Sequence, residues 1–284
     1  MTPETFDTTE QTQSLTTDIL IVGAGAAGIT LARRLRGQGI EIMLLESGGP
    51  DYDRQTQNLY EGRISGEDYY ALDESRLRFF GGTTAIWGGR CAQLDPIDFE
   101  KRPWVNHSGW PIDKQTLLPY YHEAQSTLGL PQTDGNVMPG FPDPLEGCRV
   151  RTAFWQFDEE FSRFTLPACS DLKEAEDVRI LLQASLVGLE TDESGRRVTC
   201  ARIANLQGGR AKITARSVVL ATGGLENPRI LLASQTKAHP DGIGNNTDQV
   251  GRYFMEHPHA RAARIESDTP KALFQHLPAF LRDA

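Results

Sequence analysis

The sequence of 284 residues predicts an α/β fold in which a mainly parallel sheet is joined to a β-meander. The first observation is an apolar strand at residues 18–23, followed by a helical pattern at 26–36 and a second apolar strand at 40–46. A strand, a helix and a strand in this order indicate a parallel pair with a right-handed crossover. The second observation is a change after residue 178 to short β segments separated by glycine turns, which predicts the meander.

The turn between the first strand and its helix carries the glycine pattern Gly23-x-Gly25-x-x-Gly28. Gly23 permits a tight turn, Gly25 lets a pyrophosphate approach the backbone, and Gly28 allows the helix to pack closely on the strand. The helix N-terminus, which includes Ala26 and Ala27, then faces the anion. The loop therefore predicts a dinucleotide-binding site, and a glycine-rich turn that binds nothing is the alternative.

Glu46 closes the second strand, where a carboxylate can accept hydrogen bonds from both hydroxyls of an adenosine ribose. An acid at this position disfavours a 2′-phosphate, so an NADP-type nucleotide is not expected. A dehydrogenase that uses NAD would continue with further βα units, but residues 50–78 form a long polar excursion that leads into a second glycine cluster at 81–89. The sequence therefore favours a flavin dinucleotide, with an NAD-dependent dehydrogenase as the alternative.

Composition restricts the partners and the compartment. The formal net charge is −9 and no basic cluster lies on one predicted face, so nucleic acid is not an expected partner. No apolar run reaches the length of a membrane span, and the start of the chain lacks the pattern of a secretory signal. We therefore expect a soluble, cytoplasmic protein without a metal site. The cysteines expected to be reduced, buried thiols are Cys91, Cys148, Cys169 and Cys200.

Four separated motifs, in this order, resemble those of the glucose-methanol-choline (GMC) family of FAD-dependent oxidoreductases. They are VGAGAAG with LLESG at residues 22–28 and 44–48, GGTTAIWGG at 81–89, ATGGLENPRILLAS at 221–234 and GRYFMEHPH at 251–259. The companion phrases LDPIDFEKRPWV and SGWPI resemble the members that act on sugars and glycosides, the neighbourhood of the pyranose oxidases.

The resemblance implies a Rossmann-like FAD/NAD(P)-binding domain with FAD as the cofactor. It also implies oxidation of a CH–OH group of a sugar, glycoside or polyol by hydride transfer to flavin N5. The reduced flavin would pass its electrons to oxygen, to a quinone or to an electron-acceptor protein. A non-catalytic FAD-binding module or subunit is the alternative.

The second glycine cluster would contact the flavin. By resemblance, the residues along the flavin ring and its ribityl-phosphate arm are Gly81, Gly82, Thr83 and Thr84. Backbone without Cβ atoms can approach a planar ring and direct N–H groups at it. Trp87 would form a wall of the flavin or substrate pocket, with plain core packing as the alternative. Relatives with covalently attached flavin carry a histidine where this chain has Ile86, so we expect FAD to be bound non-covalently.

Two further segments complete the expected site. The strand end that returns to the nucleotide is expected to supply Ala221, Thr222 and Gly223. Asn227 would contact the flavin or, followed by Pro228, only cap the helix at 229–234. Val187 would contact the adenine through its backbone. His257 and His259 are expected to be framework residues near the flavin, and no residue is assigned as the general base, which in this family comes from a later C-terminal motif.

The domain organisation follows from these assignments. Residues 1–16 are polar and are predicted to form a disordered tail. The FAD-binding domain would comprise residues 17–95 and 170–258. An incomplete α+β substrate domain would comprise residues 96–169 and 259–284. Because family members are much longer, we expect the chain to be a truncated N-terminal part of an enzyme, a part completed by another chain, or a degenerate protein that only holds FAD.

Overall fold

The computed structural model of the chain describes residues 3–6, 13–137, 153–256, 266 and 268. Met1–Val250 forms one compact unit and Gly251–Ala284 a second. The described residues of the second unit contain no helix or strand. Cys148, His257 and His259 lie outside the described residues, so the predictions made for them stay predictions.

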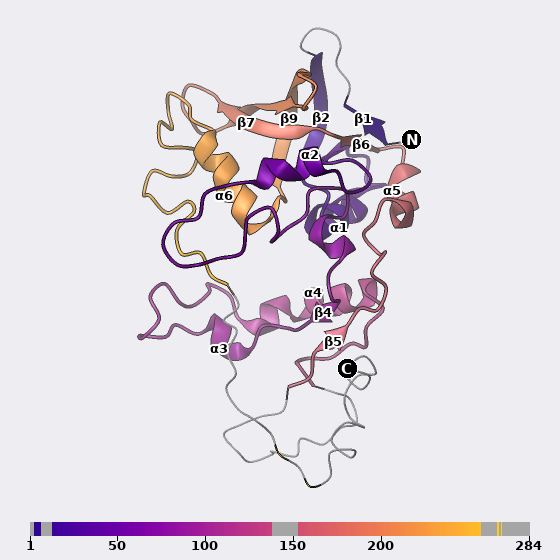
Figure 1. Cartoon of the computed structure of the whole chain (residues 1–284), viewed down its shortest axis with the longest axis vertical. Helices are drawn as coiled ribbons and strands as arrows, with labels where there is room; N and C mark the ends of the chain where they lie inside the picture. Colours follow the sequence, from indigo (N-terminus) through magenta and orange to yellow (C-terminus); the bar gives the residue numbers. More distant parts are fainter. Residues whose placement is uncertain (1–2, 7–12, 138–152, 257–265, 267, 269–284) are drawn as a thin grey trace. The chain divides into compact units, whose positions relative to one another are not determined.

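The first unit is built on a seven-stranded sheet with the strand order β1-β6-β3-β2-β9-β8-β7 (Figure 1). Its strands are β1 Glu4–Thr5, β2 Gln13–Val22, β3 Ile42–Leu45, β6 Val178–Leu182, β7 Ser185–Thr191, β8 Val198–Ala204 and β9 Arg210–Leu220. Neighbours from β1 across to β9 are parallel, whereas β9, β8 and β7 pair antiparallel as a meander. The predicted sheet with its returning meander is confirmed.

The predicted strand-helix-strand unit is β2, α1 (Ala26–Leu35) and β3. β2 and β3 are parallel neighbours, with Leu20 opposite Met43. α1 buries Ile29 and Ala32, which are spaced for one face of a helix, against the sheet. The carboxyl ends of β2 and β3 therefore lie side by side where α1 begins.

The central strands of the sheet are buried on both faces, and their successive side chains point to opposite sides. On β2, Leu20 and Val22 belong to one apolar cluster, which also contains Ile230 of α6 (Gly223–Ala233). Ile21, between them, belongs to the other cluster together with Ile29 of α1. This double burial fixes the register of the central strands and thereby the positions of the loops at their ends.

The prediction of a disordered tail at residues 1–16 is wrong for its described part. Glu4–Thr5 pairs with β6. β2 begins at Gln13, and the first residues of β2 pair with the first half of β9. Phe6 is only 3% exposed and packs in the same cluster as Leu20. The polar side chains of this segment suggested disorder, because they offer little apolar surface to bury. These residues are instead held mainly by backbone pairing with strands distant in sequence.

The predicted role of Asn227 as the cap of a helix at 229–234 is also wrong. α6 begins at Gly223, so Asn227 and Pro228 lie inside it. The side chain of Asn227 turns back and accepts hydrogen bonds from the N–H of Thr222 at 3.0 Å and from its hydroxyl at 2.6 Å. Pro228 lacks the N–H that would bond to the carbonyl of Gly224, and Gly224 is an exposed residue.

The remaining elements lie between β3 and β6. They are α2 Arg54–Gln57, η1 Asn58–Tyr60, η2 Gly82–Ala85, β4 Arg90–Cys91, α3 Pro96–Phe99, α4 Lys114–Thr127, β5 Gln156–Phe157, η3 Pro167–Cys169 and α5 Ser170–Lys173, where η denotes a 3-10 helix. β4 and β5 form an antiparallel pair of their own. Cys169 and Cys200 are buried free thiols, whereas Cys91, also free, is only partly buried. The proposed division into an FAD-binding and a substrate domain stays a prediction.

We predict that Phe6→Ala lowers the free energy of unfolding of the chain by about 3 kcal/mol, because it removes a buried aromatic ring from the core. Urea unfolding followed by circular dichroism measures this. The matched control is Phe161→Ala, since Phe161 is 50% exposed and should lose less than about 1 kcal/mol. Equal, small effects of the two substitutions would show that the N-terminal segment is not packed.

Candidate cofactor-binding site

The loop from Gly23 to Gly28 is as tightly packed as the glycine pattern predicted. Gly23 has a φ of 101°, and a Cβ added to it would lie 2.6 Å from the carbonyl oxygen of Ala221. A Cβ added to Gly28 would lie 1.9 Å from the carbonyl oxygen of Gly23. No side chain fits at either position, so the steric reasons given for Gly23 and Gly28 are confirmed.

Gly25 differs from its two neighbours in the motif, because a Cβ added to it would meet nothing within 4 Å. It is the N-cap residue of α1, and no side chain caps the helix there. The first N–H groups of a helix have no partner within the helix and attract anions. Beside Ala26 and Ala27, the loop therefore offers open backbone donors, as a pyrophosphate site requires.

Glu46 lies directly beside this loop at the end of β3. Its carboxylate accepts hydrogen bonds from the N–H of Ala24 at 3.0 Å and of Gly48 at 2.8 Å. Burial raises the pKa of Glu46 above its usual range, although these bonds and the charge of Arg78 oppose the shift. A carboxylate oxygen accepts more than one hydrogen bond, so Glu46 keeps acceptor capacity for ribose hydroxyls.

The second glycine segment contacts the first. Gly81 donates its N–H to the carbonyl oxygen of Ala24 at 2.7 Å and forms an isolated parallel bridge with Gly25. Gly81 and Gly82 both have positive φ, at 96° and 55°, which permits this approach. The structure thus brings together two motifs that the sequence could only treat separately.

Beyond these glycines, the predicted flavin contacts Thr83 and Thr84 lie in the 3-10 helix η2, where Thr83 is exposed and Thr84 is partly buried. Thr83 accepts a hydrogen bond from the N–H of Leu77 at 3.2 Å, and Thr84 donates its hydroxyl proton to the carbonyl of Gly81 at 2.6 Å. Ile86 is exposed, whereas Trp87 is partly buried and its buried indole N–H has no partner. A buried N–H without a partner is unusual for plain core packing and is compatible with a missing acceptor.

The strand end after β9 lies on the other side of the first loop. Ala221 donates its N–H to the carbonyl of Val22 at 2.8 Å, and its own carbonyl faces Gly23. Thr222 is held by Asn227, as described above. Gly223 has a φ of 86°, and a Cβ added to it would meet nothing within 4 Å. This segment therefore lies beside the first glycine loop, and its contact with the nucleotide stays a prediction.

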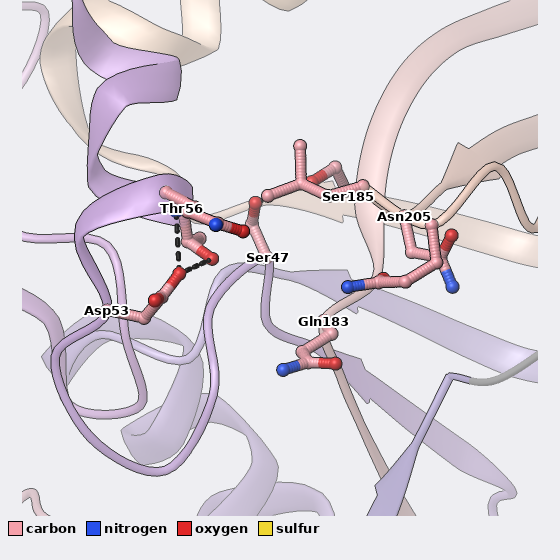
Figure 2. A pocket seen from close by; sticks show the side chains of 9 residues that line it. Ser47, Asp53, Thr56, Gln183, Ser185 and Asn205 are labelled. Atoms are coloured by element: carbon pink, nitrogen blue, oxygen red, sulfur yellow. Dashed lines mark hydrogen bonds between the residues drawn. The ribbon is translucent and has the colours of Figure 1, made fainter.

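A polar cavity of about 120 Å³ adjoins the residue after Glu46 (Figure 2). It is lined by Ser47, Asp53, Gln55, Thr56, Gln183, Ser185, Asn205, Leu206 and Gln207. The hydroxyls of Ser47 and Ser185 are hydrogen-bonded at 2.6 Å. Val187, two residues further along β7, is exposed at an irregularity in the pairing with β8. The cavity is far smaller than the roughly 300–1,000 Å³ of a pocket for a whole ligand, so it can accept only a fragment.

The profile of the family described as FAD dependent oxidoreductase matches residues 18–240. The chain belongs to this family. FAD is therefore its cofactor, and the NAD-dependent dehydrogenase that the sequence left open is not supported. The open backbone at Gly25, the carboxylate of Glu46 and the unpaired N–H of Trp87 fit such a dinucleotide.

The curated relatives of the chain are oxidoreductases of the GMC type, in agreement with the resemblance found in the sequence. The chain is 25% identical to 2-methyl-1,2-propanediol dehydrogenase of Mycolicibacterium austroafricanum, over 85% of this chain and 55% of that protein. It is 23% identical to the fructose dehydrogenase large subunit of Gluconobacter japonicus, over 87% and 59%. It is 24% identical to paromamine 6'-oxidase of Streptomyces fradiae, over 83% and 52%. The chain spans about half the length of the curated relatives it matches.

Among solved structures, pyridoxine 4-oxidase from Mesorbium loti matches with a TM-score of 0.51 and 22% identity, over 77% of this chain and 52% of that one. This likeness shows a shared fold. Within the described part of the chain, no helix is long and apolar enough to cross a membrane. The same residues contain no group of three or more His, Cys, Asp or Glu side chains that could hold a metal ion.

We predict that two alanine substitutions in the glycine loop affect different properties, FAD affinity in one case and stability in the other. Gly25→Ala should change the free energy of unfolding of the FAD-free chain by less than about 1 kcal/mol, because its Cβ meets no atom, but should weaken FAD binding at least about tenfold. Gly28→Ala should lower that free energy by about 1–3 kcal/mol, because its Cβ strikes the carbonyl of Gly23. Urea unfolding and quenching of flavin fluorescence measure the two effects.

The control for this pair is Gly208→Ala, which replaces a loop glycine away from the site. A Cβ added to Gly208 also meets nothing within 4 Å. Gly208 has positive φ, so a modest loss of stability is expected there, with FAD binding unchanged. If Gly25→Ala bound FAD as tightly as the unmodified chain, the open space at Gly25 would not be the pyrophosphate site.

Proposed function

We propose that this chain holds FAD non-covalently and, within the whole protein, serves the oxidation of a CH–OH group of a sugar, glycoside or polyol. The observation that carries the proposal is the contact of two glycine segments at the N-terminus of α1, where Gly81 binds Ala24 and Gly25 leaves open space. Backbone without side chains can accept both a pyrophosphate and a flat ring at close range.

Each segment has a proposed role toward FAD. The first loop would bind the pyrophosphate through Gly23, Gly25, Ala26, Ala27 and Gly28. Glu46 would accept the ribose hydroxyls, and Val187 would meet the adenine through its backbone. The flavin and its ribityl arm would lie along Gly81, Gly82, Thr83, Thr84 and Trp87. The returning strand end would contribute Ala221, Thr222 and Gly223, with Asn227 acting through the two hydrogen bonds that hold Thr222.

Bound FAD would supply the acceptor for the hydride that leaves the carbinol carbon. The part of this chain is to orient the flavin through bare backbone and to fix the adenosine end through Glu46. Trp87, whose indole N–H is buried and unpaired, is available as a donor to a bound group. No described residue is proposed as the general base.

The substrate class rests on the names of the relatives and on the sequence. A propanediol dehydrogenase, a fructose dehydrogenase subunit and a paromamine oxidase are named for substrates that carry CH–OH groups. The phrases at residues 94–105 and 108–112 resemble sugar-oxidising members. Since the chain spans about half of these relatives, the full activity belongs to the proposal, as does a further chain segment or an electron-acceptor protein as partner.

We predict that FAD is released by acid. Ile86, at the position of the histidine of covalent relatives, has a hydrocarbon side chain that cannot form a bond to the flavin methyl group. Precipitation of the purified yellow protein with trichloroacetic acid should leave the flavin absorbance in the supernatant. Yellow colour that stays in the washed pellet would contradict non-covalent binding.

The decisive experiment for the proposed activity is anaerobic bleaching of the bound flavin. We expect at least one member of a panel of diols, sugars and aminoglycosides to abolish the absorption band of oxidised flavin in the protein that contains this chain. Admission of air then identifies the acceptor, because rapid recovery of the band indicates oxygen, whereas slow recovery indicates a quinone or a protein. Bound flavin that no alcohol bleaches would favour a non-catalytic FAD-binding subunit.

A further inference from the structure

A buried cluster of ions lies outside the predicted site residues and centres on Glu226, in the first turn of α6. The side chain of Glu226 is 5% exposed. Its carboxylate accepts hydrogen bonds from Arg76 at 3.1 Å and from Arg229 at 2.8 Å, and it forms an ion pair with Arg78 at 3.2 Å. Arg76 and Arg78 alternate before the second glycine segment, and Glu226 lies inside the ATGGLENPRILLAS motif; the sequence predicted no role for any of the three.

The two alternating arginines bind three parts of the chain that are distant in sequence. Arg78 donates from Nη1 to the hydroxyl of Ser47 at 2.9 Å, next to Glu46. The guanidinium carbons of Arg76 and Arg78 lie 4.1 Å and 3.9 Å from the centroid of the Tyr60 ring. Both guanidinium groups are therefore within cation–π distance of the same ring.

The charges make Glu226 the anchor of the cluster. Although burial raises its pKa, the hydrogen bond and charge of Arg229 and the charges of Arg78 and Arg76 hold the pKa of Glu226 below its usual range. Glu226 is therefore ionised at neutral pH. Removing one partner from a buried pair leaves an uncompensated charge, so the arginines depend on this carboxylate for their positions.

The cluster lies next to the second glycine segment along the chain and in space. Phe79 and Phe80 separate Arg78 from Gly81, and Phe80 is fully buried. The carbonyl of Arg78 closely approaches Gly48, where an added Cβ would lie 2.2 Å from it, and Phe80 donates its N–H to Gly49 at 3.0 Å. Movement of Arg78 would therefore be transmitted to the segment that meets Ala24.

We propose that Glu226 is a positioning residue for FAD, which holds Arg76 and Arg78 so that Gly81–Thr84 keep their contact with the first glycine loop. This inference rests on the proposed binding of FAD. Since Gly81–Thr84 would meet the flavin and ribityl arm, whereas the first loop and Glu46 would meet the ADP half, loss of Glu226 should affect FAD more than ADP. A role in stability alone would not produce this selectivity.

The test compares FAD and ADP binding to the full chain and to Glu226→Gln, which keeps the shape of the side chain and removes its charge. We expect the Kd for FAD to rise at least about tenfold and the Kd for ADP less than about threefold. Fluorescence quenching gives the FAD value and equilibrium dialysis the ADP value. If Glu226→Gln does not fold, Arg76→Gln is the second variant, because it removes one of the bonds at a more exposed side chain. It should also raise the Kd for FAD more than the Kd for ADP, but by a smaller factor.

The matched control is Asp171→Asn. Asp171 is partly buried and pairs with Arg33 at 3.0 Å and with Arg36 at 2.8 Å, at the C-terminal end of α1, opposite to the end that meets the glycine segments. This variant should lose stability while its ratio of FAD to ADP affinity stays unchanged. Equal losses for FAD and ADP in Glu226→Gln, or no loss of either, would overturn the positioning role. An unmodified chain that binds ADP but not FAD would instead overturn the proposed function, and the inference with it.

Discussion

The hydrogen bond from Gly81 to the carbonyl of Ala24 is the contact on which the arrangement of the site depends. Gly81 makes this contact with a φ of 96°, which favours glycine, and it faces Gly25 across an isolated bridge. A Cβ added to Gly81 would lie 2.6 Å from the carbonyl oxygen of Phe164, whereas a Cβ added to Gly25 would meet nothing within 4 Å. The contact converts two glycine-rich turns into one surface of backbone donors at the start of α1, and the sheet beneath determines where that surface lies.

The sheet performs this task because its central strands are buried on both faces. Leu20 and Ile21, adjacent in β2, belong to different apolar clusters, so the strand can neither slip nor rotate without exposing one of them. The ends of β2, β3 and β9 therefore meet at a fixed edge. Glu46 and Ala221 are the first residues after β3 and β9, so both lie at this edge. This agrees with the rule that ligands of open α/β sheets bind at the carboxyl ends of strands.

Polar groups around this edge are buried at a cost, which their partners offset. Glu46 is buried beside Arg78, and Arg78 in turn contacts Ser47, Tyr60 and Glu226. Such networks stabilise a fold little compared with apolar packing, but they specify one arrangement of the segments that they join. In a site assembled from loops, a unique arrangement matters more than the added stability, because a bound dinucleotide must meet all the segments at once.

The sequence by itself determined the strand-helix-strand unit, the meander, the steric roles of Gly23 and Gly28, and the family, because these depend on local periodicity and on short motifs. It did not determine the pairing of Glu4–Thr5, the start of α6 at Gly223 or the partners of Glu226, because these follow from contacts between residues distant in the chain. Backbone pairing and buried charges leave little trace in local composition. Only the tertiary structure decided which glycine segment meets which, since a hydrogen bond between two backbones does not depend on side-chain identity.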